Sequence, residues 1–267
     1  MDLYSSIFTR KSTRNFASSP LSEEKLDEIK AFIETVKPLL PDAKITYKLV
    51  GPEEIKGMGV PKAPHYFLIY GEEQPLRNTC AGYLFQHVDL FLFAQGLASR
   101  WVGMIKPKSS DPNFIIGMAF GEPEKTEKRT LKDFDRKSLK EISEGKDERL
   151  EAARLAPSGL NGQPWYFIAR NGAIFVYRQK KINGLPGMMY KLTDLDVGIA
   201  LCHLAVATEK SGKPFEFLIS KGAPAAPDGA LFVGTVKKKN LPILIEVGKF
   251  LNIKQFFYIQ LENILHD

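Results

Sequence analysis

Residues 156–165 read Ala-Pro-Ser-Gly-Leu-Asn-Gly-Gln-Pro-Trp and are the most distinctive stretch of this 267-residue chain. Two prolines restrict the backbone, two glycines let a ligand approach it closely, and Ser158 and Asn161 offer polar side chains. A plain turn between a helix and a strand also favours Pro, Gly, Ser and Asn. The complete string is more specific than that, and it predicts a polar-lined binding pocket at the start of a strand that Trp165 anchors.

A basic cluster, Arg-Lys-Ser-Thr-Arg, lies near the N-terminus at residues 10–14. Clustered cationic and hydroxyl donors are what a phosphate group requires. We expect a helical turn here, which would place Arg10 and Arg14 on one face. A solvated basic turn is the alternative interpretation of so short a cluster.

These two motifs resemble those of the nitroreductase family of FMN-dependent oxidoreductases. Residues 96–104, with Trp101 and Gly103, resemble the family's loop beside the flavin ring, although a helix end with a core tryptophan is the alternative. Residues 121–129 resemble its late basic pair, although a solvated charged run is the alternative there. The resemblance implies cofactor binding by Arg10, Lys11, Ser12, Arg14, Val102, Gly103, Lys128, Arg129, Pro157, Ser158, Gly159 and Asn161.

The distance between the two main motifs departs from the family pattern, in which little more than one helix separates them. Here more than half the chain lies between residues 10–14 and 156–165. In family homodimers the FMN lies at the subunit interface, and the partner subunit supplies the Pro-Ser-x-x-Asn segment. Where the first half should carry that segment it has residues 36–41, without Ser or Asn, and the second half lacks a Trp-x-Gly loop at 211–215. The halves therefore look complementary, as after gene fusion of an isologous dimer.

An internal repeat supports that interpretation, because Gly82, His87 and Gly96 align with Gly198, His203 and Gly212 at one constant spacing. We therefore predict an α+β fold with two nitroreductase-like halves, residues 1–135 and 136–267, each with a small mixed or antiparallel sheet flanked by helices. The prediction is a monomer that acts as a pseudo-dimer with one shared FMN site; the tail, residues 240–267, is unassigned. Residues 136–140, Arg-Lys-Ser-Leu-Lys, echo the basic cluster and leave a second phosphate site as an alternative.

Hydrophobic periodicity predicts the elements of both halves. We expect helices at 22–36, 79–100, 149–155 and 192–210, and a partly helical stretch at 241–265. We expect strands at 43–50, 65–70, 114–120, 165–170, 173–178, 215–220 and 230–236, with Asn171-Gly172 forming a hairpin turn. The charged residues 124–149 read as a connector between the halves.

Bulk composition limits the functions that remain. Hydrophobic residues make up 44% and charged residues 25% of the chain, which is ordinary for a globular protein. The net charge of +6 is spread thinly and lacks a nucleic-acid-binding module, so we expect no nucleic-acid partner. Two cysteines and four scattered histidines predict neither a disulfide framework nor a metal site. With no apolar run that could span a membrane and no signal peptide, we expect a cytoplasmic protein without a membrane partner.

The resemblance implies an enzyme that passes a hydride from NAD(P)H, through N5 of FMN, to a nitroaromatic or quinone in ping-pong turnover. It implies no obligatory side-chain acid or base, so no catalytic residue is assigned. Arg14 is expected toward the pyrimidine edge of the ring, where its charge would stabilise reduced flavin. The alternative is an FMN-binding protein without turnover, because the residues that bind FMN are not those that select a substrate.

Overall fold

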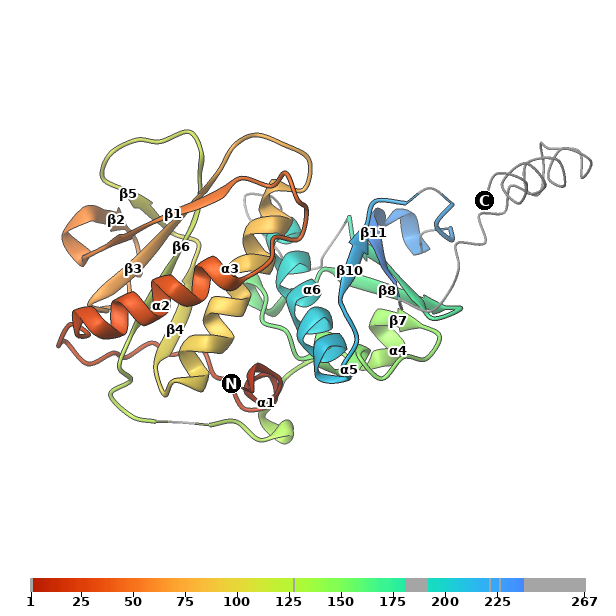
Figure 1. Cartoon of the computed structure of the whole chain (residues 1–267), viewed down its shortest axis with the longest axis horizontal. Coiled ribbons are helices and arrows are strands. Elements are labelled where there is room, and N and C mark those ends of the chain that lie inside the picture. The colour runs from red at the N-terminus through yellow and green to blue at the C-terminus, as the bar shows by residue number, and fades with distance from the viewer. Residues whose placement is uncertain (1, 127, 181–191, 221, 226, 238–267) are drawn as a thin grey trace, which may run out of the picture.

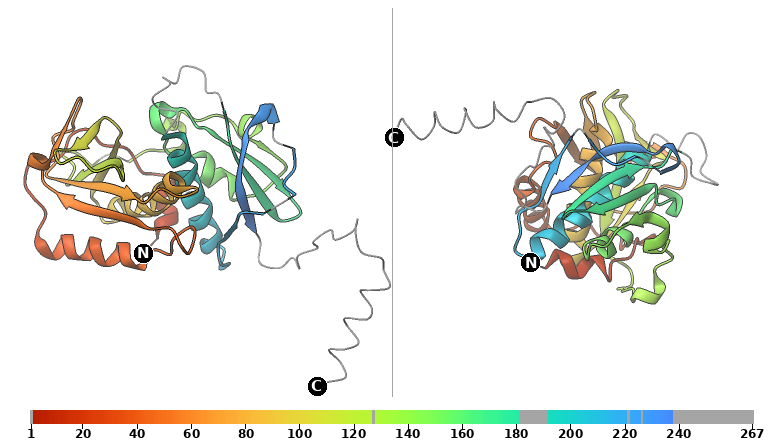
Figure 2. Two further views of the ribbon diagram at one scale, coloured as in Figure 1. Left: turned by 90° about the horizontal axis from the view of Figure 1, so that it is seen from above. Right: turned by 90° about the vertical axis from the view of Figure 1, so that its right-hand side faces the viewer.

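Two β-sheets lie on opposite sides of a central pair of long helices, α3 and α6 (Figure 1). The same arrangement is visible from above (Figure 2, left). This computed structural model describes residues 2–126, 128–180, 192–220, 222–225 and 227–237. The partly helical stretch expected at 241–265 and the tail at 240–267 lie outside the described residues.

The helices of the first part are α1 (Leu3–Ile7), α2 (Glu23–Thr35) and α3 (Arg77–Ala94), and those of the second part are α4 (Leu139–Ile142), α5 (Leu150–Arg154) and α6 (Thr193–Lys210). Short 3-10 turns are η1 (Pro52–Glu54), η2 (Leu131–Asp133), η3 (Gly159–Asn161) and η5 (Pro227–Gly229). The predicted helix start at Ser22 is confirmed, because its side chain accepts a hydrogen bond from the backbone N–H of Lys25 at 3.3 Å.

The first sheet has the strand order β1-β3-β6-β4, built from β1 (Ile45–Val50), β3 (His65–Gly71), β6 (Phe114–Gly121) and β4 (Ala98–Val102). The second sheet has the order β10-β11-β9-β8-β7, built from β10 (Glu216–Leu218), β11 (Leu231–Lys237), β9 (Ala173–Arg178), β8 (Trp165–Arg170) and β7 (Ser143–Glu144). A separate ribbon pairs β2 (Ile55–Gly57) with β5 (Ile105–Pro107). All strand pairs are antiparallel except β7–β8. Without β7, the second sheet has the order β8-β9-β11-β10, which corresponds strand for strand to the order β1-β3-β6-β4 of the first sheet.

The hairpin predicted at Asn171-Gly172 is confirmed, and it joins β8 to β9. Both turn residues have positive φ, 52° for Asn171 and 74° for Gly172, as a two-residue hairpin turn of this type requires. Arg170 and Ala173 pair directly across it. Local turn chemistry therefore sets the register of this hairpin.

Strand β3 is buried along its whole length because both of its faces are covered. Phe67 and Ile69 belong to the large core that contains α2 and α3, whereas Tyr66 and Leu68 pack with the β2–β5 side. This explains why residues 65–70 read as a continuous apolar run and not as an alternating one.

Helices α3 and α6 approach each other closely at two glycines. A Cβ atom at Gly82 would lie 2.1 Å from the carbonyl oxygen of Leu195, and one at Gly198 would lie 2.0 Å from that of Thr79. Both helices are buried on all sides, which matches their nearly continuous apolar sequence. The crossing is therefore possible only because both positions lack a side chain.

The helix expected at 79–100 is shorter than predicted and ends at Ala94. Gly96 adopts φ = 78°, and the N–H of Leu97 bonds to the carbonyl of Leu92 at 2.9 Å. This cap is a Schellman motif, and it releases the chain into strand β4. The glycine was visible in the sequence, but the apolar residues around it masked the end of the helix.

The connector predicted at 124–149 contains η2, α4 and β7, which composition alone did not indicate. Cys80 and Cys202 are free and buried. Among the helices that the structure describes, none has the length and apolarity needed to cross a membrane. No cluster of three or more His, Cys, Asp or Glu side chains suited to a metal ion occurs in the described ranges.

Candidate functional site

A cavity of about 1090 Å³ lies where the N-terminal segment, the end of β4, the connector and residues 157–161 meet. Eleven of the twelve residues predicted to bind a cofactor line it: Arg10, Lys11, Ser12, Arg14, Val102, Gly103, Arg129, Pro157, Ser158, Gly159 and Asn161. Lys128 is the exception, since it lines an adjoining cleft that Lys11 and Arg129 share with the main cavity. The fold thus brings the N-terminal segment together with residues from the middle of the chain.

The segment carrying the basic cluster is extended, so the predicted helical turn at residues 10–14 is wrong. Helix α1 ends at Ile7, and the backbone N–H of Thr13 donates to the carbonyl of Ser99 on β4 at 3.2 Å. On the other side, the N–H of Arg129 donates to the carbonyl of Thr9 at 2.9 Å. Tertiary backbone hydrogen bonds replace the helical ones, and they place the cluster between β4 and the connector.

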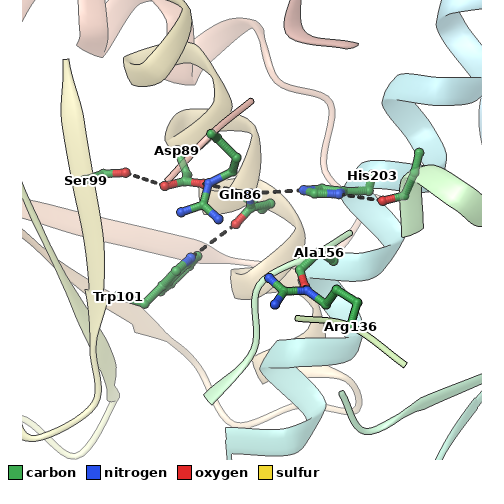
Figure 3. Close-up of polar contacts among 9 residues, drawn as sticks. Gln86, Asp89, Ser99, Trp101, Arg136, Ala156 and His203 are labelled. Carbon is green, nitrogen blue, oxygen red and sulfur yellow. Dashed lines mark hydrogen bonds and ion pairs between the residues drawn. The ribbon is translucent and has the colours of Figure 1, made fainter. Parts of the chain in front are cut away.

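Arg10 is almost fully buried and forms an ion pair with Asp89 of α3. Its Nε lies 2.8 Å from Oδ2 of Asp89, and the two side chains are 2% and 1% exposed. Asp89 also accepts hydrogen bonds from Gln86 and from the hydroxyl of Ser99 (Figure 3). A buried carboxylate needs several donors, and these groups supply them. Arg10 is therefore held rigidly at the cavity wall.

Gln86 extends this network from α3 to α6 (Figure 3). Its Oε1 accepts the indole N–H of Trp101 at 3.2 Å, and its Nε2 lies 3.2 Å from Nε2 of His203. The Nδ1–H of His203 donates to the carbonyl of Ala152 at 2.8 Å, which leaves Nε2 as the acceptor for Gln86. Burial lowers the pKa of His203 to about 3, so this neutral form persists at physiological pH.

Segment 156–165 has a constrained backbone. Leu160, Asn161 and Gln163 have φ angles of 49°, 57° and 49°, and residues other than glycine rarely adopt such positive values. Hydrogen bonds hold this shape: the N–H of Gln163 donates to Oγ of Ser158 at 2.9 Å, and the N–H of Gly159 donates to Asp196 at 3.0 Å. Such strain persists where the surroundings enforce it, and it often marks a functional site.

Asn161 is linked to the connector. Its Oδ1 accepts a hydrogen bond from Arg136 at 2.8 Å, and its Nδ2 donates to the carbonyl of Asp135 at 2.9 Å. Arg136 also donates to the carbonyl of Ala156 at 3.0 Å (Figure 3) and lines the main cavity. Arg136, the first residue of the basic stretch 136–140, thus faces the same cavity that Arg10 lines.

The cavity has a large excess of positive charge. Its cationic lining residues are Arg10, Lys11, Arg14, Arg100, Lys125, Arg129 and Arg136, and its carboxylates are Glu124, Asp133 and Asp135. Burial, followed by the charges of Arg10 and Arg129, lowers the pKa of Arg136 to about 10. Burial and then Arg10 lower the pKa of Arg129. An anion placed among these cations would relieve this repulsion.

Sequence reasoning missed two charged contributors in particular, Asp89 and Arg100. Asp89 lies inside an apolar helix, and a carboxylate at such a position is a signal that a buried cation faces it. Arg100 lay within segment 96–104 but was not among the predicted site residues; its place in the lining follows from the early end of α3. The pairing of Asp89 with Arg10 could not be predicted from sequence spacing, since the two residues are far apart in the chain.

The buried carboxyl of Asp196, which accepts a hydrogen bond from the N–H of Gly159, allows the environment of segment 156–165 to be tested by varying the pH. Burial raises the pKa of this carboxyl to about 7 from its ordinary value of 3.8, against the lowering effect of the Gly159 N–H. In the folded chain Asp196 keeps its proton up to about pH 7, whereas in the unfolded chain it releases the proton near pH 3.8. The contribution of Asp196 to the free energy of unfolding therefore falls as the pH rises from 3.8 to 7, and it is constant above pH 7. We expect Asp196→Asn to remove that fall, which amounts to roughly 4 kcal/mol at most.

The measurement is urea unfolding of both proteins at pH 4 and pH 8. Asparagine keeps an oxygen for the Gly159 N–H and never ionises, so the variant should gain stability relative to the parent as pH rises. Parallel pH profiles for the two proteins would refute the assignment.

Comparison with known proteins places this fold and cavity in context. Residues 2–208 match the family model described as "Putative TM nitroreductase". A search of curated proteins found no match. The crystal structure of a "putative nitroreductase" from Thermotoga maritima MSB8 superposes with a TM-score of 0.63 at 20% identity, covering 88% of this chain and 93% of that one.

Two further solved structures cover about half of this chain. A "putative nitroreductase in complex with FMN" from Desulfovibrio desulfuricans has 16% identity, a TM-score of 0.41, and coverage of 53% of this chain and 94% of its own. A nitroreductase family protein from Clostridium difficile 630 has 18% identity, a TM-score of 0.41, and coverage of 53% and 95%. The Thermotoga superposition shows a nitroreductase-like α+β fold, and the family match over most of the sequence shows that the chain belongs to the "Putative TM nitroreductase" family.

Proposed function

We propose that this chain is an FMN-dependent oxidoreductase that uses NAD(P)H to reduce a small acceptor such as a nitroaromatic or a quinone. The observation that carries the proposal is the single cavity lined by residues of the basic cluster, the β4 loop and segment 156–165. Its volume of about 1090 Å³ is at the upper end of the usual range for ligand pockets, and its cations suit a dianionic phosphate. Bound FMN would supply hydride transfer, chemistry that side chains cannot perform.

The residues of the chain would bind and orient the cofactor. Lys11, Ser12 and Arg129 are proposed to bind the phosphate, with Lys128 contributing charge from the adjoining cleft. Arg10 would present its remaining N–H groups in a direction set by Asp89. Pro157, Ser158, Gly159 and Asn161 would line the other side, and Val102 and Gly103 would line the edge at the end of β4. No side chain is proposed as an acid or base.

We further propose that the chain is an internal duplication, with halves at residues 1–135 and 136–267, which works as a monomeric pseudo-dimer. Three features support this: the shared order of pairing in the two sheets, the reciprocal contacts of Gly82 and Gly198, and equivalent helix ends. Helix α6 ends like α3, because Gly212 has φ = 72° and the N–H of Lys213 bonds to the carbonyl of Thr208 at 3.4 Å. A duplicated dimer would have such two-fold related contacts at its centre.

Replacing Arg129 with alanine tests the phosphate assignment. We expect FMN to bind about 10–100-fold more weakly, because one charge-assisted hydrogen bond is lost. Riboflavin, which has no phosphate, should bind within about threefold of its parent affinity. The readout is quenching of flavin fluorescence on titration. Lys132→Ala is the matched control, since Lys132 is an exposed cation of the same connector that lines neither cavity.

Two measurements on the purified protein test the wider proposal. We expect one FMN per chain at a native mass of one chain; two FMN per chain or an obligate dimer would contradict the pseudo-dimer. Anaerobic NADH or NADPH should bleach the flavin absorbance. A yellow protein that keeps its colour would support the non-catalytic alternative, and a protein that binds no FMN would overturn both.

A further inference from the structure

Gln86 is a fully buried amide in the middle of α3, and each polar atom of its side chain has a partner. Its Nε2 donates to Oδ2 of Asp89 at 2.8 Å and to Nε2 of His203 at 3.2 Å. Its Oε1 accepts the indole N–H of Trp101 at 3.2 Å (Figure 3). An amide turned end for end would place its oxygen against the carboxylate of Asp89 and its N–H groups against the indole N–H. Only one orientation of this side chain is therefore stable.

Two of the bonds of Gln86 lead to the wall of the cavity. Trp101 of β4 lines the cavity itself. Asp89 accepts from Gln86 and from Nε of Arg10 on the same oxygen, Oδ2, and Arg10 also lines the cavity. The position of one buried amide therefore affects both an indole ring and a guanidinium group at this wall.

The third partner of Gln86 is His203 of α6, which lies 117 residues further along the chain. His203 is fully buried, and its Nδ1–H donates to the carbonyl of Ala152 in α5 at 2.8 Å. This bond to the backbone fixes the imidazole ring and leaves Nε2 as the acceptor for Gln86. Because an unpaired buried donor or acceptor is costly, the linked groups hold one another in a single arrangement. Packing around α6 thus reaches a residue at the cavity wall.

We propose that Gln86 is a positioning residue for FMN binding, which holds the indole of Trp101 and the guanidinium of Arg10 in place at the cavity wall. His203 anchors Gln86 to α6. The inference rests on the proposed function, because FMN is the ligand that the indole and the guanidinium would meet. Neither Gln86 nor His203 is among the described residues that line the cavity, so both act through their hydrogen-bonded neighbours. Such a role predicts a change at Trp101 even when no cofactor is bound.

Trp101 can be observed alone, because the chain has two tryptophans and the other one can be replaced. Trp165→Phe keeps a buried aromatic ring and loses no hydrogen bond, since the indole N–H of Trp165 has no partner in the part of the chain that the structure describes. In this background and without FMN, we expect Gln86→Leu and His203→Phe to increase the motion of Trp101. The measurement is the amplitude of the sub-nanosecond phase in time-resolved fluorescence anisotropy, the time range of side-chain rotation.

Affinity for FMN is the second measurement, made by quenching of flavin fluorescence. We expect the dissociation constant of FMN to rise about 3–10-fold in Gln86→Leu and in His203→Phe, as for the loss of one neutral hydrogen bond. His87→Phe is the matched control, because His87 is also a buried histidine but its Nδ1 lies 2.9 Å from the carbonyl of Tyr83 in its own helix. This control should change neither the motion of Trp101 nor the affinity for FMN.

The two measurements together decide the role of Gln86. Unchanged motion of Trp101 in Gln86→Leu overturns the proposal, even if that variant is less stable. Greater motion without weaker FMN binding, or a control that behaves like the two variants, shows a merely structural role and also overturns it. If Gln86→Leu does not fold, His203→Phe decides by the same measurements, since it leaves the bonds of Gln86 to Asp89 and Trp101 in place. A parent protein that binds no FMN overturns the proposed function, whereas the anisotropy still tests whether Gln86 holds Trp101.

Discussion

Replacing Gly198 with alanine is expected to destabilise the folded chain by at least about 3 kcal/mol, a loss in the range of severe core changes. The new Cβ would lie 2.0 Å from the carbonyl oxygen of Thr79, a backbone atom that cannot rotate away. Relief would require α3 and α6 to separate, and these helices connect the two sheets of the protein. Gly82→Ala should act similarly through the carbonyl of Leu195 at 2.1 Å. The measurement is the free energy of unfolding in urea.

Gly59→Ala is the control for this prediction. Nothing lies within 4 Å of a Cβ at Gly59, and its φ of 62° adds only conformational strain of about 1–2 kcal/mol. A Gly198→Ala protein no less stable than this control would mean that the helix pair is loosely packed, which would contradict the structure.

The buried ion pair gives the second large effect. Arg10→Ala leaves the carboxylate of Asp89 at 1% exposure without its counter-charge, and we expect a loss of about 3–5 kcal/mol in unfolding free energy. The double variant Arg10→Ala, Asp89→Ala should lose less than the sum of the single variants, because neither charge is then left unpaired. Urea unfolding of the four proteins completes the cycle.

An exposed ion pair serves as the control for this cycle. Lys30 and Asp27 are 43% and 70% exposed, so Lys30→Ala should change stability by no more than about 1 kcal/mol. Strict additivity of the Arg10 and Asp89 substitutions would show that the pair is not coupled. Arg129 is the better residue for testing phosphate binding, because Arg10→Ala is expected to lower the stability of the protein as well. A lower affinity for FMN in Arg10→Ala could then not be separated from the loss of stability.

Much of the fold could be predicted from local sequence, because local chemistry decides those elements. The side chain of Ser22 begins α2, Asn171 and Gly172 form the hairpin turn, and strands β8 and β9 have the predicted bounds. Errors arose where long-range contacts compete with periodicity. The segment at residues 10–14 carries a helix-like spacing of arginines, yet its backbone bonds to β4 and the connector instead.

The candidate site was predictable in part. Segment 156–165 was identified by its distinctive string of residues and by its resemblance to a family motif, whereas its positive φ values fall on Leu160, Asn161 and Gln163, where the composition does not indicate them. The residues that line the cavity with it were grouped by resemblance to a family. Their electrostatic environment could not be predicted, since it depends on distances between residues remote in the chain.

The sequence by itself determined the order of the elements, because turn chemistry and hydrophobic periodicity act over a few residues. Its resemblance to a family implied the class of fold and the residues expected to meet a ligand. Only the tertiary structure decided that Asp89 holds Arg10 and that Arg136 lines the same cavity as Arg10. The physical reason is that burial and charge–charge interaction arise from packing, and packing joins segments that local sequence leaves independent.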